Sequence, residues 1–280
     1  MSKPFLLSDL GVIQVSGADQ TSYLQGQLTC DLTKLDEQGW LAGSHCDAKG
    51  KMWSNFVMLK SDQGILLVMD KHVLSASLSA LQKFGVFAKV DITDASDSLY
   101  IYGDLDQTTE TPAIAKAQLP FGCLWLSAEL VDHETETTDW TVQQIKAGWP
   151  LLANAEQVSE FVPQMLNQAD IGAISFKKGC YIGQETVARM QYLGKQKRAT
   201  FYLTGEAPSE ALGDIEVNRN GNWRKAGTII NAATDSQNQL HLLAVLASDA
   251  SAEQQYRLSQ APQTPLQIQD LPYTPAQAAE

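Results

Sequence analysis

The chain has 280 residues, of which 44% are hydrophobic and 19% charged, so it can bury a sizeable core in two or three domains. No apolar stretch approaches the roughly 20 residues that cross a membrane, and the start of the chain has no secretory or transit pattern. We therefore expect a soluble, cytoplasmic protein. The net charge of -12 repels nucleic-acid phosphates at long range and argues against a general RNA- or DNA-binding protein.

The first 150 residues mix strand and helix patterns. Residues 104–138 are polar and interrupted by prolines, and only 123–126 has a strand pattern there. Glycine and proline at 148–150 end the last helix of this part. We predict strands over 12–16, 53–59, 64–69, 88–92, 99–102 and 123–126, a hairpin turn at 62–64, and helices that end at Leu24 and that span 73–84 and 140–147.

After Gln191 the character of the chain changes. Short strands separated by turns are typical of a small all-β barrel or sandwich, and the turn at 220–222 is one such signal. The domain boundary is expected near residue 196. The predicted strands span 200–203, 215–217, 226–230, 240–246 and 266–268.

The four cysteines and four histidines are scattered along the chain. No Cys-x-x-Cys pair is present, which argues against a zinc ribbon and against a redox dithiol. Unpaired cysteines fit a reducing compartment. We therefore predict no metal site.

Positive charge gathers in one segment of this acidic chain. Between Lys177 and Arg198 there are six basic residues and one acidic residue, Glu185, which gives a local net charge of +5. Such a segment is either a solvated loop and helix face or a site for an anionic ligand.

Residues 178–185 of this segment form a loop bracketed by two glycines, followed by a helix pattern over 186–190. A thiol beside two ammonium groups and ahead of a helix N-terminus is favoured as the thiolate. Cys180 is therefore a candidate reactive group, with Lys178 as its cationic neighbour. The alternative is a small buried cysteine at a loop-to-helix junction.

Two other features have both a structural and a functional interpretation. Residues 45–55 form a turn between two strands, in which Asp47 and Gly50 have the usual turn chemistry, so an ordinary hairpin explains them. Trp140 and Trp149 could stack on a flat heteroaromatic ligand, but tryptophan more often belongs to the core.

At residues 178–185 the sequence closely resembles the signature of the YgfZ family. The resemblance extends to further segments over nearly the whole chain, at 17–19, 25–27, 45–55, 161–164, 174–177 and 222–224. It implies an α+β fold like that of the glycine-cleavage T-protein, with two ferredoxin-like α+β domains around a central folate site and a small C-terminal β-barrel. On this basis residues 1–40 and 139–195 are expected to form the first domain, 41–138 the second and 196–280 the barrel.

The same resemblance implies tetrahydrofolate or a derivative as ligand. Two tryptophans of the family are associated with folate; one matches Trp140, whereas the other position holds Leu10 here. The T-protein has a pair of aspartates, one of them catalytic, where this chain has Ser54 and Asn55. Without that carboxylate, aminomethyl transfer loses its acid or base group, so we do not expect an aminomethyltransferase.

The resemblance further implies a role in iron-sulfur protein maintenance and in the thiolation of some tRNAs, with an influence on replication initiation. Iron-sulfur enzymes or assembly factors are then the expected partners. Given the overall charge, we expect the effect on tRNA to be indirect, and we expect a monomer without membrane contact. The alternatives are a folate-dependent transferase that acts on a small amine and a non-catalytic adaptor.

Overall fold

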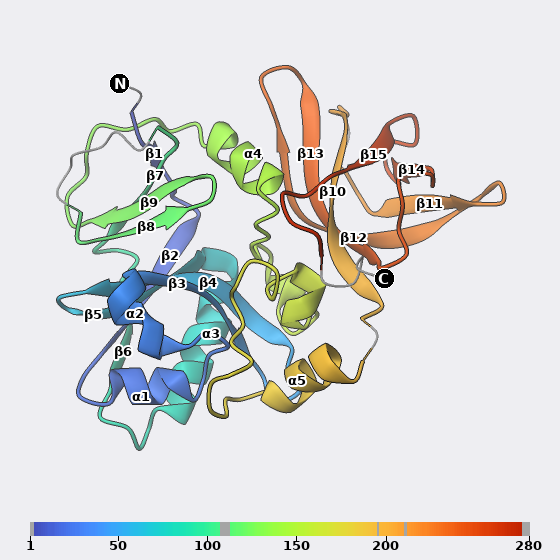
Figure 1. Ribbon diagram of the computed structural model, residues 1–280. Helices are drawn as coiled ribbons and strands as arrows, with labels where there is room; N and C mark the ends of the chain where they lie inside the picture. Colours follow the sequence, from blue (N-terminus) through green and yellow to red (C-terminus); the bar gives the residue numbers. More distant parts are fainter. Residues whose placement is uncertain (1–2, 107–112, 195, 210–211, 276–280) are drawn as a thin grey trace.

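The computed structural model describes residues 3–106, 113–194, 196–209 and 212–275 (Figure 1). The chain forms two antiparallel sheets, several helices and a closed C-terminal barrel. The predicted α+β class with a C-terminal barrel is therefore confirmed. Among the described residues no helix is both long and apolar enough to cross a membrane.

The first sheet has five antiparallel strands in the order β3-β4-β5-β2-β6. Every residue of β5 is buried, which explains why its sequence is apolar without interruption. The strand predicted at 88–92 begins only at Asp91, because residues 85–89 form turns and bends. The strands are β2 (Leu10–Ser16), β3 (Trp40–Cys46), β4 (Met52–Ser61), β5 (Gly64–Asp70) and β6 (Asp91–Asp94).

Helices cover one face of this sheet. The main core cluster joins Leu24 of α1 (Gln20–Gln25) and Leu81 of α3 (Lys71–Phe84) to sheet residues such as Leu67. The Tyr23 hydroxyl donates to the Leu81 carbonyl oxygen at 2.5 Å and so ties α1 to α3. Two shorter elements, η1 (Leu32–Lys34) and α2 (Leu35–Gln38), lead into β3.

A four-stranded antiparallel sheet covers the opposite face. Its order is β1-β7-β9-β8, and its inward residues share a second core cluster with Val12 and Val68 of the first sheet. The strands are β1 (Phe5–Leu6), β7 (Tyr100–Asp104), β8 (Ala115–Leu119) and β9 (Gly122–Ser127). The sequence missed β8, whose buried positions are mostly alanine and so give a weak apolar signal.

The sheets group the chain differently from the predicted domains. β2 pairs with β5 and with β6, so residues on both sides of position 40 belong to one sheet. The physical reason is that β2 is an interior strand, so the backbone amide and carbonyl groups on both of its edges need hydrogen-bond partners.

The barrel closes in the order β10-β13-β12-β11-β14-β15, with β15 pairing back to β10. The predicted strands are confirmed, and the three-residue β14 is an addition. Between the sheets and the barrel lie α4 (Thr138–Lys146), η2 (Ala155–Gln157), η3 (Pro163–Leu166) and α5 (Gln184–Tyr192). The barrel strands are β10 (Arg198–Glu206), β11 (Ile215–Arg219), β12 (Asn222–Thr234), β13 (Gln239–Ala247), β14 (Tyr256–Leu258) and β15 (Pro265–Gln269).

Helix α4 joins the sheets to the barrel. It packs against β12 and β13 (Figure 1). The buried Ile145 of α4 belongs to one apolar cluster with Tyr202 and Leu243 of the barrel. Barrel residues therefore lie directly beside α4.

Candidate functional site

A pocket of about 290 Å³ opens where α4, the start of β2 and the barrel meet. Leu10 and Trp140, which are far apart in the sequence, both line it. A smaller cavity of about 30 Å³ shares Leu10 and Trp140 and continues inward to Phe121 and Trp149. The structure thus brings the two residues associated with folate by resemblance to one place.

The indole of Trp140 is held firmly. Its side chain is only 4% exposed, and the Phe121 ring meets it edge-on at 5.0 Å between centroids. It also lies against the backbone of β7 and β9, because a Cβ on Gly103 or Gly122 would come within 2.5 or 2.7 Å of the ring. Trp140 is therefore both a core residue and a wall of the pocket.

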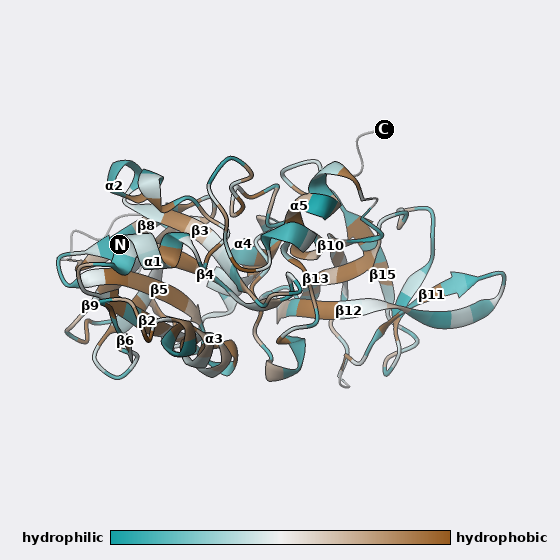
Figure 2. Ribbon diagram, turned by 90° about the horizontal axis from the view of Figure 1, so that it is seen from below, coloured by the Kyte–Doolittle hydropathy of each residue, from teal (hydrophilic) through white to brown (hydrophobic). Residues whose placement is uncertain are grey.

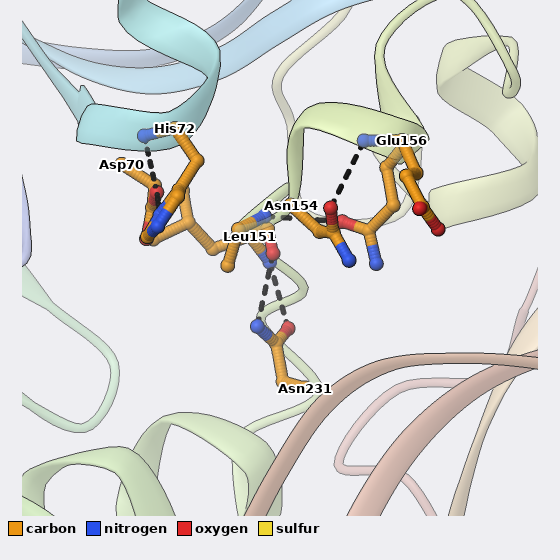
Figure 3. A network of polar contacts seen from close by, with 8 residues as sticks. Asp70, His72, Leu151, Asn154, Glu156 and Asn231 are labelled. Carbon is orange, nitrogen blue, oxygen red and sulfur yellow. Dashed lines mark hydrogen bonds and ion pairs between the residues drawn. The ribbon is translucent and has the colours of Figure 1, made fainter. Parts of the chain in front are cut away.

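A carboxylate faces the same pocket. Asp70, the last residue of β5, is buried and is the N-cap of α3. Its Oδ1 accepts hydrogen bonds from the backbone amide and from Nδ1 of His72, both at 2.8 Å (Figure 3). Both bonds end on Oδ1, so Oδ2 takes no part in this pair. Gln144 of α4 adds a buried amide to the lining.

The barrel side of the pocket is fixed by Asn231 of β12. Its Oδ1 accepts from the Leu151 amide and its Nδ2 donates to the Leu151 carbonyl oxygen, each at 2.9 Å (Figure 3). A side-chain amide thus pairs with the backbone as a neighbouring strand would. Asn154 then caps η2 by accepting from the Glu156 amide.

The positions of the two T-protein aspartates are occupied by buried, bonded side chains. Asn55 Nδ2 donates to the Pro150 carbonyl oxygen at 2.7 Å, and its Oδ1 accepts from the Leu152 amide at 2.9 Å. The Ser54 hydroxyl lies 3.1 Å from that of Ser77. Asn55 therefore holds the segment that carries Leu151, and neither side chain supplies an acid or base group.

The loop at 178–185 lies elsewhere, and neither Lys178 nor Cys180 lines the pocket. The Lys178 side chain turns inward, where Nζ donates to the carbonyl oxygens of Leu28 and Cys30, each at 2.7 Å. Burial lowers the pKa of Lys178 to about 8, although the nearby Cys30 and Asp31 raise it. One of the two ammonium groups expected beside Cys180 is thus used to close the loop.

This loop packs against the turn at 45–55 through glycines. Gly183 has a φ of +83°, and a Cβ there would lie 2.4 Å from the Asp47 carbonyl oxygen. Gly50 has a φ of +76°, and a Cβ there would lie 2.8 Å from the Cβ of Thr186. The Ile182 amide also donates to the carbonyl oxygen of Gly26. Three segments that the sequence singles out therefore form one assembly, which we name the loop assembly (residues 26–30, 47–50 and 178–186).

Cys180 is the exposed thiol of this assembly, whereas Cys30 and Cys46 are buried. Burial raises the pKa of the Cys30 thiol to about 12 and also raises that of Cys46. The alternative of a small buried cysteine therefore does not describe Cys180. Of the predicted basic segment, Lys195 lies outside the described residues.

Relatives of known name match nearly the whole chain. A family model described as "YgfZ, beta-barrel domain" matches residues 196–261. The tRNA-modifying protein YgfZ of Colwellia psychrerythraea is 37% identical over 302 residues, covering 96% of this chain and 92% of the relative. The chain belongs to the YgfZ family. Another YgfZ relative, from Aliivibrio fischeri, is 36% identical and covers 96% of this chain and 91% of its own length.

The T-protein-like fold is confirmed as well. The crystal structure of the glycine cleavage system aminomethyltransferase T from Bartonella henselae has a TM-score of 0.68 to this YgfZ-family chain. It covers 97% of this chain and 86% of its own, with 11% sequence identity. At that identity the likeness concerns the fold alone.

Sequence reasoning missed the polar residues of the pocket, which include Asp70, Gln144 and Asn231. Asp70 did carry a signal, because aspartate directly before a helical pattern is a usual N-cap. Gln144 and Asn231 carried none, since their place depends on how α4 docks on the barrel. No group of three or more His, Cys, Asp or Glu side chains in the described ranges is arranged to hold a metal.

Proposed function

We propose that the protein binds tetrahydrofolate or a derivative in the pocket of Leu10 and Trp140 and supports the modification of tRNA. One observation carries the proposal: a pocket of about 290 Å³, large enough for a flat heteroaromatic ring, is lined by Leu10, Trp140 and the carboxylate of Asp70. The YgfZ relatives named as tRNA-modifying proteins support the second half.

The lining fits a pterin ring in its chemistry. Leu10, Leu151 and the small exposed part of Trp140 offer apolar surface to a flat ring. Asp70 can accept hydrogen bonds from amino groups on the ring, and the Gln144 amide can both donate and accept. The pocket volume of about 290 Å³ lies at the lower end for small-molecule sites, so the rest of a folate would extend outward.

In this proposal the folate either carries one-carbon units or acts as a bound ligand that regulates the protein. The exposed Cys180 provides a thiol that can react with a partner protein. Iron-sulfur enzymes that modify tRNA are the partners we infer, with consequences for replication initiation downstream. A folate-dependent transferase is less supported, because Asn55 carries no acid or base group and its amide binds the backbone.

Calorimetric titration with tetrahydrofolate and its 5-formyl derivative tests the site. The variants are Trp140→Phe and Ala232→Trp, the latter filling the pocket from an exposed position on β12. Ala252→Trp is the matched control, since Ala252 is also exposed on the barrel but does not line the pocket.

The natural protein and Ala252→Trp should bind saturably, Trp140→Phe more weakly, and Ala232→Trp at least about tenfold more weakly because the ring has no room. Equal binding by Ala232→Trp and Ala252→Trp would refute the pocket assignment. A Cys180→Ser strain with unchanged tRNA thiolation would refute the thiol role separately.

A further inference from the structure

The hairpin of β11 and β12 extends away from the rest of the barrel, and its outer part is hydrophilic (Figure 2). Its tip is Asn220-Gly221, with φ values of +54° and +86° that suit the tight turn of a two-residue hairpin. Beside it lies a hollow of about 480 Å³, remote from the Leu10 pocket along β12. The proposed folate chemistry does not use this hollow.

Positive side chains line the hollow. Arg219, Arg224 and Lys225 all border it, together with uncharged residues such as Asn222 and Tyr256. No carboxylate belongs to its lining. In a chain with a net charge of -12, three cationic side chains around one hollow are a local reversal of sign.

Strand register places two of these cations on one face. Val217 pairs with both Arg224 and Tyr256, and Arg219 pairs with Asn222, so Arg219 and Arg224 are diagonal neighbours. Such neighbours lie about 7 to 8 Å apart. Both are exposed, and among the ion pairs of the described residues neither has a carboxylate partner.

The acidic residues nearby are largely engaged with other cations. Glu216 binds Arg257 at 2.8 Å on the opposite face of the hairpin, where the Arg257 guanidinium also lies over Trp223. Asp214 pairs with Lys225 at 2.9 Å. Two further acids lie near the hollow: Asp249 is close enough to act on the Tyr256 hydroxyl, and Glu253 directly precedes the lining residue Gln254. Neither forms an ion pair with Arg219 or Arg224 among the described residues. Arg219 and Arg224 are therefore left for an external anion.

We propose that this hollow binds phosphate groups of the RNA backbone, so that the protein contacts tRNA directly through its barrel. The inference rests on the proposed tRNA role for the identity of the anion. Paired guanidinium groups suit phosphate because each can donate two parallel hydrogen bonds. The expectation of an indirect effect on tRNA came from the total charge, which hides a cluster assembled from both strands of a hairpin.

Binding of an unmodified tRNA transcript, measured by fluorescence anisotropy over a series of salt concentrations from about 50 to 200 mM, tests the proposal. The variants are Arg219→Ala/Arg224→Ala and Arg219→Lys/Arg224→Lys. Lys83→Ala/Lys89→Ala is the matched control, because it also removes two exposed positive charges, far from the hollow. Thermal unfolding and folate titration of every variant check the fold and the other site.

The alanine pair should weaken tRNA binding by about tenfold or more and lower the salt slope by about 2, one for each lost phosphate contact. The lysine pair should restore part of the affinity, and the control pair should bind like the natural protein. Three results would overturn the proposal: no tRNA binding at low salt, equal losses in the alanine and control pairs, or arginine-dependent binding of inorganic phosphate without tRNA binding. If the natural protein bound tRNA in this way but did not bind folate, the result would count against the proposed folate site and not against this proposal.

Discussion

The Leu10 pocket and the loop assembly use their residues in opposite ways. The pocket gathers side chains from β2, α4 and β12, none of which forms a local motif. The loop assembly is made of recognisable motifs, yet most of their residues serve packing: glycines allow backbones to touch, and Lys178 closes the loop. Cys180, by contrast, is exposed to solvent. The motif that is easiest to recognise in this sequence therefore does not line the Leu10 pocket.

Among these variants Gly183→Ala should destabilise the protein most, because the new Cβ in the loop assembly would lie 2.4 Å from the Asp47 carbonyl oxygen. We expect a loss of about 4 kcal/mol in the free energy of unfolding, from the left-handed backbone and from overpacking together. Gly172→Ala is the control, because Gly172 has a similar φ of +78° but nothing within 4 Å of a Cβ. Urea unfolding should show a loss of only about 1 kcal/mol there, and equal losses would contradict the close packing.

Asn55→Asp should cost about 3 kcal/mol, because the Pro150 carbonyl oxygen loses its donor and a buried carboxylate takes its place. The change introduces a carboxylate at this position, yet it should weaken the proposed folate binding by loosening Leu151. Unfolding and calorimetry on the same variant measure both effects. If Asn55→Asp were as stable as the natural protein, Asn55 would not be needed to hold the segment that carries Leu151.

Lys178→Met should cost about 2 kcal/mol at neutral pH, because two buried carbonyl oxygens lose a charged donor. The loss should grow with pH. Burial lowers the pKa of Lys178 from 10.5 to about 8, so between these values the unfolded chain binds more protons than the folded one. Stability from the lysine therefore rises across this window.

Unfolding of the natural protein and Lys178→Met at about pH 7, 8.5 and 10 measures the difference, which cancels the titration of tyrosines and cysteines common to both. A gap between the two proteins that shrinks as the pH rises would contradict the buried position of the ammonium group.

Cys180→Ser should leave the free energy of unfolding within about 0.5 kcal/mol of the natural protein, because the side chain is exposed. In the folded natural protein an alkylating reagent should modify Cys180 first, Cys123 more slowly, and Cys30 and Cys46 only after unfolding. Mass spectrometry of the labelled peptides gives the order. A first reaction at Cys30 would show that the loop assembly opens readily.

Much of the fold follows from the sequence, because the apolar runs of β2, β4 and β5 and the spacing of α3 reflect burial directly. Strands β8 and β14 do not follow, since one buries small alanines and the other has three residues. Of the site, Leu10 and Trp140 come from a resemblance rather than from a local pattern. Asn231 could not be predicted, because its bonds to Leu151 span 80 residues.

The docking of α4 on the barrel also determines when the pocket can form during synthesis. Ile230, Asn231 and Ala232 contribute to the pocket, and the neighbouring β13 is needed to hold them in place. During synthesis on the ribosome the two sheets can therefore form early, while the pocket is completed only after the barrel has emerged. A nascent chain lacks the barrel side of the pocket until synthesis is complete. A ligand of the pocket would therefore stabilise only full-length, folded chains.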